Sequence, residues 1–138
     1  MADKVSVIGS GGWGTALAMH LKNLGNDVTL WSWREEESRE IEKHSENREF
    51  LPGIILPRGI VYTYDLKKAV SDADVLVFAV PSHAVFNTAR AVSSYIKTGA
   101  VIVNVSKGFE HESLRRLSEV IEEACPNTPI AVLSGPSH

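Results

Sequence analysis

Near the start of the chain stands the segment Val5-Ser6-Val7-Ile8-Gly9-Ser10-Gly11-Gly12-Trp13-Gly14-Thr15-Ala16-Leu17, in which a short apolar run meets a glycine-rich loop and then a helical pattern. Gly9, Gly11 and Gly14 occupy the three glycine positions of the G-x-G-x-x-G pattern. A strand before the loop and a helix after it form the context in which this pattern binds the pyrophosphate of a dinucleotide. The segment therefore predicts a dinucleotide-binding turn.

Each glycine has its own expected role. Gly9 makes the tight turn out of the strand, Gly11 leaves room for the pyrophosphate, and Gly14 lets the helix pack closely on the sheet. The free N–H groups and partial positive charge at the helix N-terminus attract the phosphates. A plain strand-to-helix turn, or a different nucleotide as in methyltransferases, is the alternative. We expect the cofactor contacts of the loop to come from Gly9, Ser10, Gly11, Gly12, Trp13 and Gly14.

The composition is that of one globular domain. The chain has 138 residues, 43% of them hydrophobic and 22% charged, with a net charge of −3. This charge gives no reason to expect nucleic acid or an anionic membrane as a partner, and no apolar run is long enough to cross a bilayer. Cys125 is the single cysteine, which excludes an intrachain disulfide and favours a reducing compartment. We expect a cytoplasmic protein without an integral membrane segment.

Apolar and helical segments alternate along the whole sequence, which predicts parallel βαβ units. Predicted helices include a charged, solvated one at residues 34–44, a short one capped by Asp65, and one capped by Ser82. A further helix turns Leu114, Leu117, Ile121 and Ala124 inward. Residues 1–138 should thus form an α/β, doubly wound, parallel six-stranded sheet with strand order 3-2-1-4-5-6. The predicted strands are residues 4–8, 27–31, 60–63, 75–80, 101–105 and 130–133.

In such a sheet, ligands bind beyond the carboxyl ends of the strands. NAD-specific domains usually place an acid after the second strand for the adenosine ribose, but here Trp33 and Arg34 follow that strand. Arg34 can form a bidentate contact with a 2′-phosphate, and Trp33 can flank the adenine, so NADP(H) is favoured over NAD(H). Two alternatives are that Arg34 pairs with neighbouring glutamates, or that Glu35 accepts from the ribose.

Three further loops should face the same crevice. Pro81 follows the fourth strand, beside the expected nicotinamide half of the cofactor. Lys107 follows the fifth strand and suits an anionic substrate or a substrate oxygen, unless it is simply a solvated lysine. Gly135 and Ser137 follow the sixth strand and suit a phosphate or a hydroxylated ligand. The histidines lack metal-ligand spacing, so we expect no metal.

The segments that carry a family resemblance are residues 9–18, Leu30-Trp31, Asn47 with Phe50-Leu51-Pro52, Val80-Pro81-Ser82, Ser106-Lys107-Gly108 and Ser134-Gly135-Pro136-Ser137. Together they resemble the N-terminal domain of one family, the bacterial-type NAD(P)-dependent sn-glycerol-3-phosphate dehydrogenases. The resemblance implies reversible hydride transfer between NAD(P)H and dihydroxyacetone phosphate, giving glycerol 3-phosphate for phospholipid synthesis. It implies that Gly12, Trp13, Trp33 and Arg34 bind the cofactor, that Lys107 contacts cofactor and substrate, and that Gly135 and Ser137 bind the substrate.

Family members are about twice as long, and their acid/base lysine lies in a C-terminal helical domain. That domain is absent from these 138 residues, so we expect no catalytic residue here and no turnover by the chain alone. The full-length protein is a possible homodimer. Two other interpretations are a non-catalytic dinucleotide sensor and a relative of 6-phosphogluconate or ketopantoate reductases. The loop that holds Lys107 and the Gly135-Pro136 pair argue against the latter.

Overall fold

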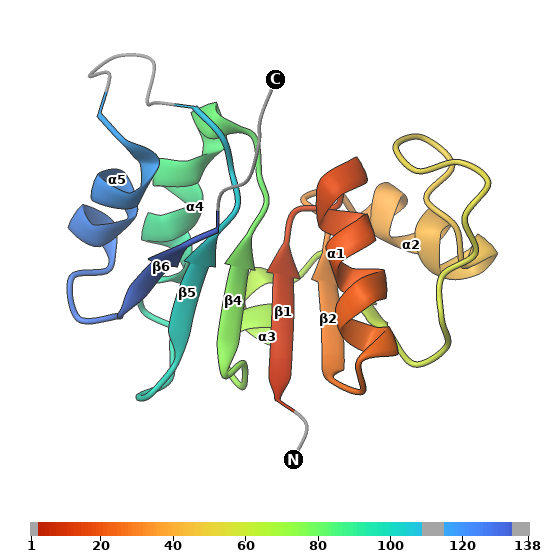
Figure 1. The fold of residues 1–138 in the computed structure, drawn as a ribbon, viewed down its shortest axis with the longest axis horizontal. Helices are drawn as coiled ribbons and strands as arrows, with labels where there is room; N and C mark the ends of the chain where they lie inside the picture. Colours follow the sequence, from red (N-terminus) through yellow and green to blue (C-terminus); the bar gives the residue numbers. More distant parts are fainter. Residues whose placement is uncertain (1–2, 109–114, 134–138) are drawn as a thin grey trace.

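Six parallel strands form one sheet, and the helices that connect them lie on both of its faces (Figure 1). The computed structural model describes residues 3–108 and 115–133. The strand order β3-β2-β1-β4-β5-β6 confirms the predicted doubly wound topology. The strands are β1 (Lys4–Ile8), β2 (Asp27–Trp31), β3 (Val61–Thr63), β4 (Val75–Phe78), β5 (Val101–Asn104) and β6 (Ile130–Val132).

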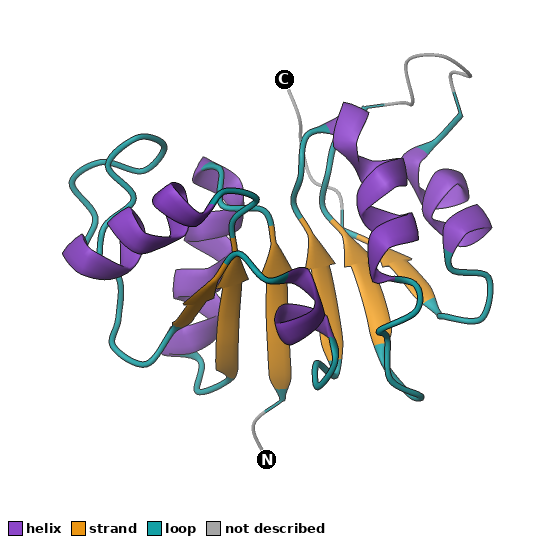
Figure 2. Cartoon of the chain, turned by 180° about the vertical axis from the view of Figure 1, so that it is seen from behind, coloured by secondary structure: helices purple, strands orange, loops and turns teal. Residues whose placement is uncertain are grey.

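The helices divide between the two faces of the sheet, and Figure 2 shows the face opposite to that of Figure 1. On one face, α1 (Gly12–Asn23) and α2 (Glu35–His44) cover the half of the sheet formed by the first strands. On the other face lie α3 (Leu66–Val70), α4 (Val85–Val92) and α5 (Leu117–Ala124). A single 3₁₀ turn, η1 (Ser82–Ala84), precedes α4.

The buried strands alternate their side chains between two apolar clusters. Val7 and Val77 face the α1 side, whereas Ile8, Leu76 and Phe78 face the α4 side. Period-two alternation with both faces apolar is what a central parallel strand requires when helices cover both sides. The two central strands β1 and β4 are therefore held from both faces, and their carboxyl ends form a firm base for the loops beyond them.

Some predicted boundaries and roles need correction. Helix α2 is not wholly solvated, because Ile41 is buried against the sheet. Ser82 does not cap α4 with its side chain, since the 3₁₀ turn η1 intervenes. The fourth and fifth strands end at Phe78 and Asn104, because the chain leaves the ladder earlier to form the loops of the carboxyl edge. Asp65 caps α3 as predicted, and Leu114 lies outside the described residues.

The amino ends of the strands carry a cluster of ion pairs. Lys4 pairs with Asp72, and Lys97 Nζ lies 2.7 Å from Asp74 Oδ1. The hydrogen bonds from these lysines hold the pKa of both carboxyls below the ordinary value. These charges neutralise one another at this edge.

Within residues 3–108 and 115–133, no helix is both long and apolar enough to span a bilayer.

Candidate functional site

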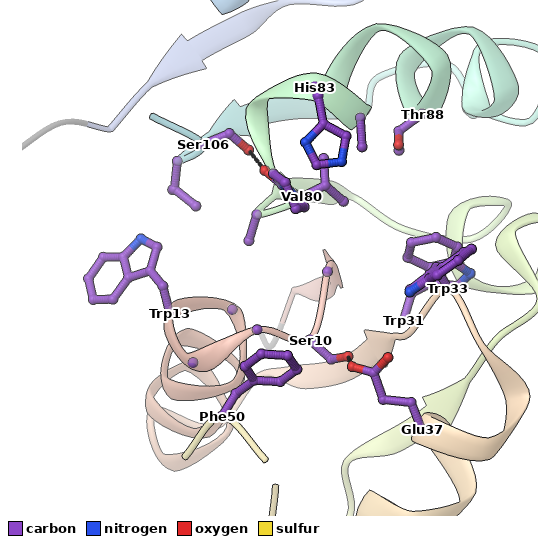
Figure 3. A pocket seen from close by; sticks show the side chains of 18 of the residues that line it. Ser10, Trp13, Trp31, Trp33, Glu37, Phe50, Val80, His83, Thr88 and Ser106 are labelled. Carbon is purple, nitrogen blue, oxygen red and sulfur yellow. Dashed lines mark hydrogen bonds between the residues drawn. The ribbon is translucent and has the colours of Figure 1, made fainter. Parts of the chain in front are cut away.

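A cavity of about 950 Å³ lies at the carboxyl edge of the sheet, over the point where β1 and β4 lead their loops in opposite directions. Figure 3 shows side chains from both halves of the fold turned toward it. The glycine loop lies on one side, and the loops after β4 and β5 lie on the other. This is the crevice at which doubly wound sheets bind their ligands.

The glycine loop has the backbone geometry that the sequence predicts. Gly9 has φ +123°, and a Cβ there would lie 2.6 Å from the carbonyl oxygen of Ala79. At Gly14 a Cβ would lie 2.0 Å from the carbonyl oxygen of Gly9, so the helix start and the strand end are in contact. A Cβ at Gly11 would meet no atom within 4 Å, which leaves open space beside the backbone. Two glycines thus permit close packing, and the third leaves room for a ligand.

Helix α1 presents its positive end to the cavity. Thr15 donates the first intrahelical hydrogen bond, to the carbonyl of Gly11 at 3.0 Å, and the N–H groups before it have no intrahelical acceptor. No acidic side chain lies in the first turn to offset the helix dipole. The residues therefore fit a pyrophosphate, with open space at Gly11 and free donors at Gly12, Trp13 and Gly14.

A second loop braces the glycine loop from outside. The Asn47 side chain, only 2% exposed, donates to the carbonyl of Ser10 at 2.7 Å and to Thr15 Oγ1 at 2.8 Å. Its Oδ1 accepts from the N–H of Phe50 at 3.2 Å, which brings the Phe50 ring to the cavity wall (Figure 3). Asn47 therefore ties the loop of residues 45–56 to the glycine turn.

The end of the cavity next to β2 carries aromatic and charged groups. Trp33 is 72% exposed, and the Arg34 guanidinium lies 5.6 Å from the centre of its ring. Arg34 forms no ion pair with a described residue, so the alternative in which it pairs with neighbouring glutamates is wrong. Arg39 takes that role with Glu35, at 2.5 Å. Trp33 and Arg34 thus offer an open plane and a cation to a ligand.

The opposite wall comes from the loops after β4 and β5. Ser106 Oγ donates to the carbonyl of Val80 at 2.7 Å (Figure 3). It also lies 3.2 Å from the carbonyl oxygen of Phe78. These bonds fix the two loops to each other. Pro81 and Lys107 line the cavity from this side. Lys107 is exposed and makes no ion pair with the described part of the chain.

The structure brings ten of the predicted residues together around this one cavity: Gly9, Ser10, Gly11, Gly12, Trp13, Gly14, Trp33, Arg34, Pro81 and Lys107. Gly135 and Ser137, the predicted substrate contacts, lie outside the described residues. No group of three or more potential metal ligands occurs among residues 3–108 and 115–133.

Sequence reasoning assigned no site role to several residues that line the cavity, and Glu37 and Phe50 are two of them. Glu37 lies three residues after Arg34, and this i, i+3 spacing along the start of a helix was the available signal. Phe50 had no such signal, because its position depends on the fold of an irregular loop. Glu35, the residue named as an alternative ribose acceptor, does not line the cavity.

Comparison with known proteins identifies the family of this chain. Residues 4–138 match the family model described as "NAD-dependent glycerol-3-phosphate dehydrogenase N-terminus". The protein named glycerol-3-phosphate dehydrogenase [NAD(P)+] from Fusobacterium nucleatum is 45% identical over 98% of this chain, which covers 41% of that protein. Its namesake from Bacillus subtilis is also 45% identical over 98% of this chain, which covers 40% of it.

A solved structure shows the same fold. The crystal structure of glycerol-3-phosphate dehydrogenase from Coxiella burnetii superposes with a TM-score of 0.90 at 31% identity, over 99% of this chain and 42% of that one. The chain spans only about two fifths of the length of these relatives. By the family match over almost its whole length, the chain belongs to the NAD-dependent glycerol-3-phosphate dehydrogenase family and corresponds to its N-terminal domain.

Proposed function

We propose that this chain is the cofactor-binding part of a dehydrogenase that transfers a hydride reversibly between NAD(P)H and dihydroxyacetone phosphate, giving sn-glycerol 3-phosphate for phospholipid synthesis. The observation that carries the proposal is the single cavity shared by the glycine loop, Arg34 and Lys107. Family membership supports the reaction class. A cytoplasmic location and a homodimer of the full-length protein belong to the same proposal.

Different residues along the cavity would bind different parts of the cofactor. The N–H groups of the glycine loop would hold the pyrophosphate, and the loop around Pro81 would line the nicotinamide half. Trp33 would flank the adenine, and Arg34 would bind a 2′-phosphate, which supports a preference for NADP(H) over NAD(H). The bound dinucleotide supplies the hydride. The strand order puts Arg34 and Lys107 on opposite sides of the β1–β4 junction, so the two cations would serve opposite ends of the cofactor.

Lys107 is the residue of this chain best suited to the substrate. Its ammonium group would hold an oxygen of dihydroxyacetone phosphate by charge, next to the nicotinamide. Gly135 and Ser137 would contact the same substrate. The general acid/base lysine implied by the family resemblance is expected outside residues 1–138. We therefore propose that this chain binds the cofactor without turning over the substrate.

Tryptophan fluorescence tests the cofactor proposal directly. All three tryptophans of the chain, Trp13, Trp31 and Trp33, line the cavity, so a bound dinucleotide must change their emission. We expect saturable quenching by NADPH and NADH and none by S-adenosylmethionine. Quenching by S-adenosylmethionine alone would support a methyltransferase-like site instead. With dihydroxyacetone phosphate and NADPH, the chain should bind the cofactor but not oxidise it. Steady oxidation of NADPH would contradict the proposal that this chain binds the cofactor without turning over the substrate.

Gly11→Ala separates cofactor binding from folding. The added methyl group meets no protein atom within 4 Å, and the backbone there has a negative φ of −67°, so the free energy of unfolding should change by less than about 0.5 kcal/mol. The same methyl group occupies the space through which a pyrophosphate approaches the backbone. We expect dissociation constants for NADH and NADPH to rise about tenfold or more. Unchanged affinity would mean that the pyrophosphate lies elsewhere.

A further inference from the structure

A carboxylate stands at the end of the cavity where the Arg34 cation lies. Glu37 extends from the first turn of α2 back toward the glycine loop, and its Oε1 accepts a hydrogen bond from Ser10 Oγ at 2.6 Å (Figure 3). Ser10 lies between Gly9 and Gly11, and Glu37 lines the same cavity as Trp33 and Arg34. The carboxylate is therefore at the adenosine end of the proposed cofactor site.

A short chain of hydrogen bonds fixes the position of this carboxylate. Ser32 Oγ donates to Ser10 Oγ at 2.7 Å, and Ser10 Oγ donates onward to Glu37. Ser10 and Ser32 are 5% and 1% exposed, so both hydroxyls are out of bulk water. Hydrogen bonds to an ionised acceptor are the short, strong kind, and a buried chain strengthens them further. Glu37 is thus held against the phosphate loop rather than free to turn into solvent.

The carboxylate still has capacity for a ligand. A carboxylate accepts at both oxygens, and Ser10 occupies one position on Oε1. Among residues 3–108 and 115–133, no cation pairs with Glu37, whereas Glu35, Glu40 and Glu46 each have a basic partner. The free lone pairs suit the hydroxyl groups of a ribose, and the negative charge opposes a phosphate in the same place.

Resting on the proposed function, we propose that Glu37 is a specificity-determining residue at the adenosine ribose: it accepts from the 2′-hydroxyl of NAD(H) and counteracts the attraction of Arg34 for the 2′-phosphate of NADP(H). Arg34 and Glu37 bring opposite unit charges to one end of the cavity. A 2′-phosphate would be attracted by Arg34 and repelled by Glu37, whereas a 2′-hydroxyl would donate a hydrogen bond to Glu37. The native chain therefore favours NADPH over NADH only slightly, by a few-fold at most.

Glu37→Gln tests this assignment because it removes the charge and keeps an oxygen that can accept from Ser10. We expect the ratio of the NADH to the NADPH dissociation constant to rise about tenfold, chiefly through tighter NADPH binding. Since the effect is electrostatic, the difference between variant and native ratios should shrink as salt is raised. Arg34→Met should move the ratio the opposite way. Tryptophan quenching measures all of these constants.

Glu36→Gln is the matched control. It removes the same charge from the same helical turn, but Glu36 does not line the cavity, so its ratio should stay within about twofold of native. If Glu37→Gln weakens or strengthens both cofactors in parallel, Glu37 only positions Ser10 and the proposal is overturned. An unchanged ratio overturns it as well. Glu37→Ala, which loses the Ser10 bond, must also raise the ratio if the charge is what discriminates.

The two proposals fail in different ways. Binding of neither dinucleotide by the native chain would overturn the proposed function and this assignment with it. Binding of both, with a ratio that Glu37→Gln does not move, would overturn the assignment alone. Thermal melting of each variant ensures that a folded protein is compared.

Discussion

Gly14→Ala is expected to lower the free energy of unfolding by about 3 kcal/mol or more and to abolish dinucleotide binding. The Cβ of an alanine at this position would lie 2.0 Å from the carbonyl oxygen of Gly9 and 3.2 Å from the Cβ of Ala79. Neither neighbour can swing away. The oxygen belongs to the backbone directly after β1, and Cβ is the whole side chain of Ala79. Relief requires that α1 move off the sheet, which opens the phosphate loop and the apolar cluster beneath it.

Thermal melting and fluorescence titration of the Gly14→Ala variant check this expectation. The predicted loss corresponds to a fall in Tm of about 10 °C or more for a domain of this size. Gly25→Ala is the control: it also places alanine near a helix end, at φ +97° but in open space, so it should cost only about 1 kcal/mol and leave cofactor affinity intact. A Gly14→Ala variant that melts within 3 °C of the native chain would refute the close contact.

The glycine fingerprint and the apolar runs were sufficient to predict the topology. Strands β1 and β2 have the bounds predicted for them, because the local pattern of apolar residues determines where these strands begin and end. The strand ends at Phe78 and Asn104 were harder to predict. Val80 and Val105 are as apolar and as buried as the strand residues, so hydrophobicity alone does not show where the ladder stops.

The candidate site also contains residues that the sequence predicts and residues that it does not. Residues directly after a strand, such as Arg34 and Lys107, reach the cavity because the carboxyl ends of parallel strands share one edge. Glu37 and Phe50 reach it for a different reason. Their positions depend on the angle of α2 and on the path of residues 45–56, and tertiary contacts such as those of Ser10 and Asn47 determine both. Sequence patterns carry no direct record of such contacts.

Asn47→Ala is expected to cost about 2 to 3 kcal/mol and to weaken dinucleotide binding roughly tenfold. The side chain is buried and makes three hydrogen bonds, two donated to Ser10 and Thr15 and one accepted from Phe50. An alanine leaves the half-buried N–H of Phe50 without its acceptor and removes one of the hydrogen bonds to the buried carbonyl of Ser10. Such orphaned groups carry the full desolvation cost, which exceeds the net value of an ordinary hydrogen bond.

The loss of binding has a separate cause from the loss of stability. Asn47 holds both the carbonyl of the phosphate loop and the residue whose ring lines the cavity, so its removal loosens two walls at once. Asn26→Ala is the matched control, since Asn26 also donates its amide to a backbone carbonyl, that of Leu21 at 3.0 Å, but far from the cavity. That variant should lose at most about 1 kcal/mol and keep native affinity. If the Asn47 and Asn26 variants lose equal affinity, the brace on the phosphate loop does not contribute to binding, and the glycine turn holds its geometry through Gly9 and Gly14 alone.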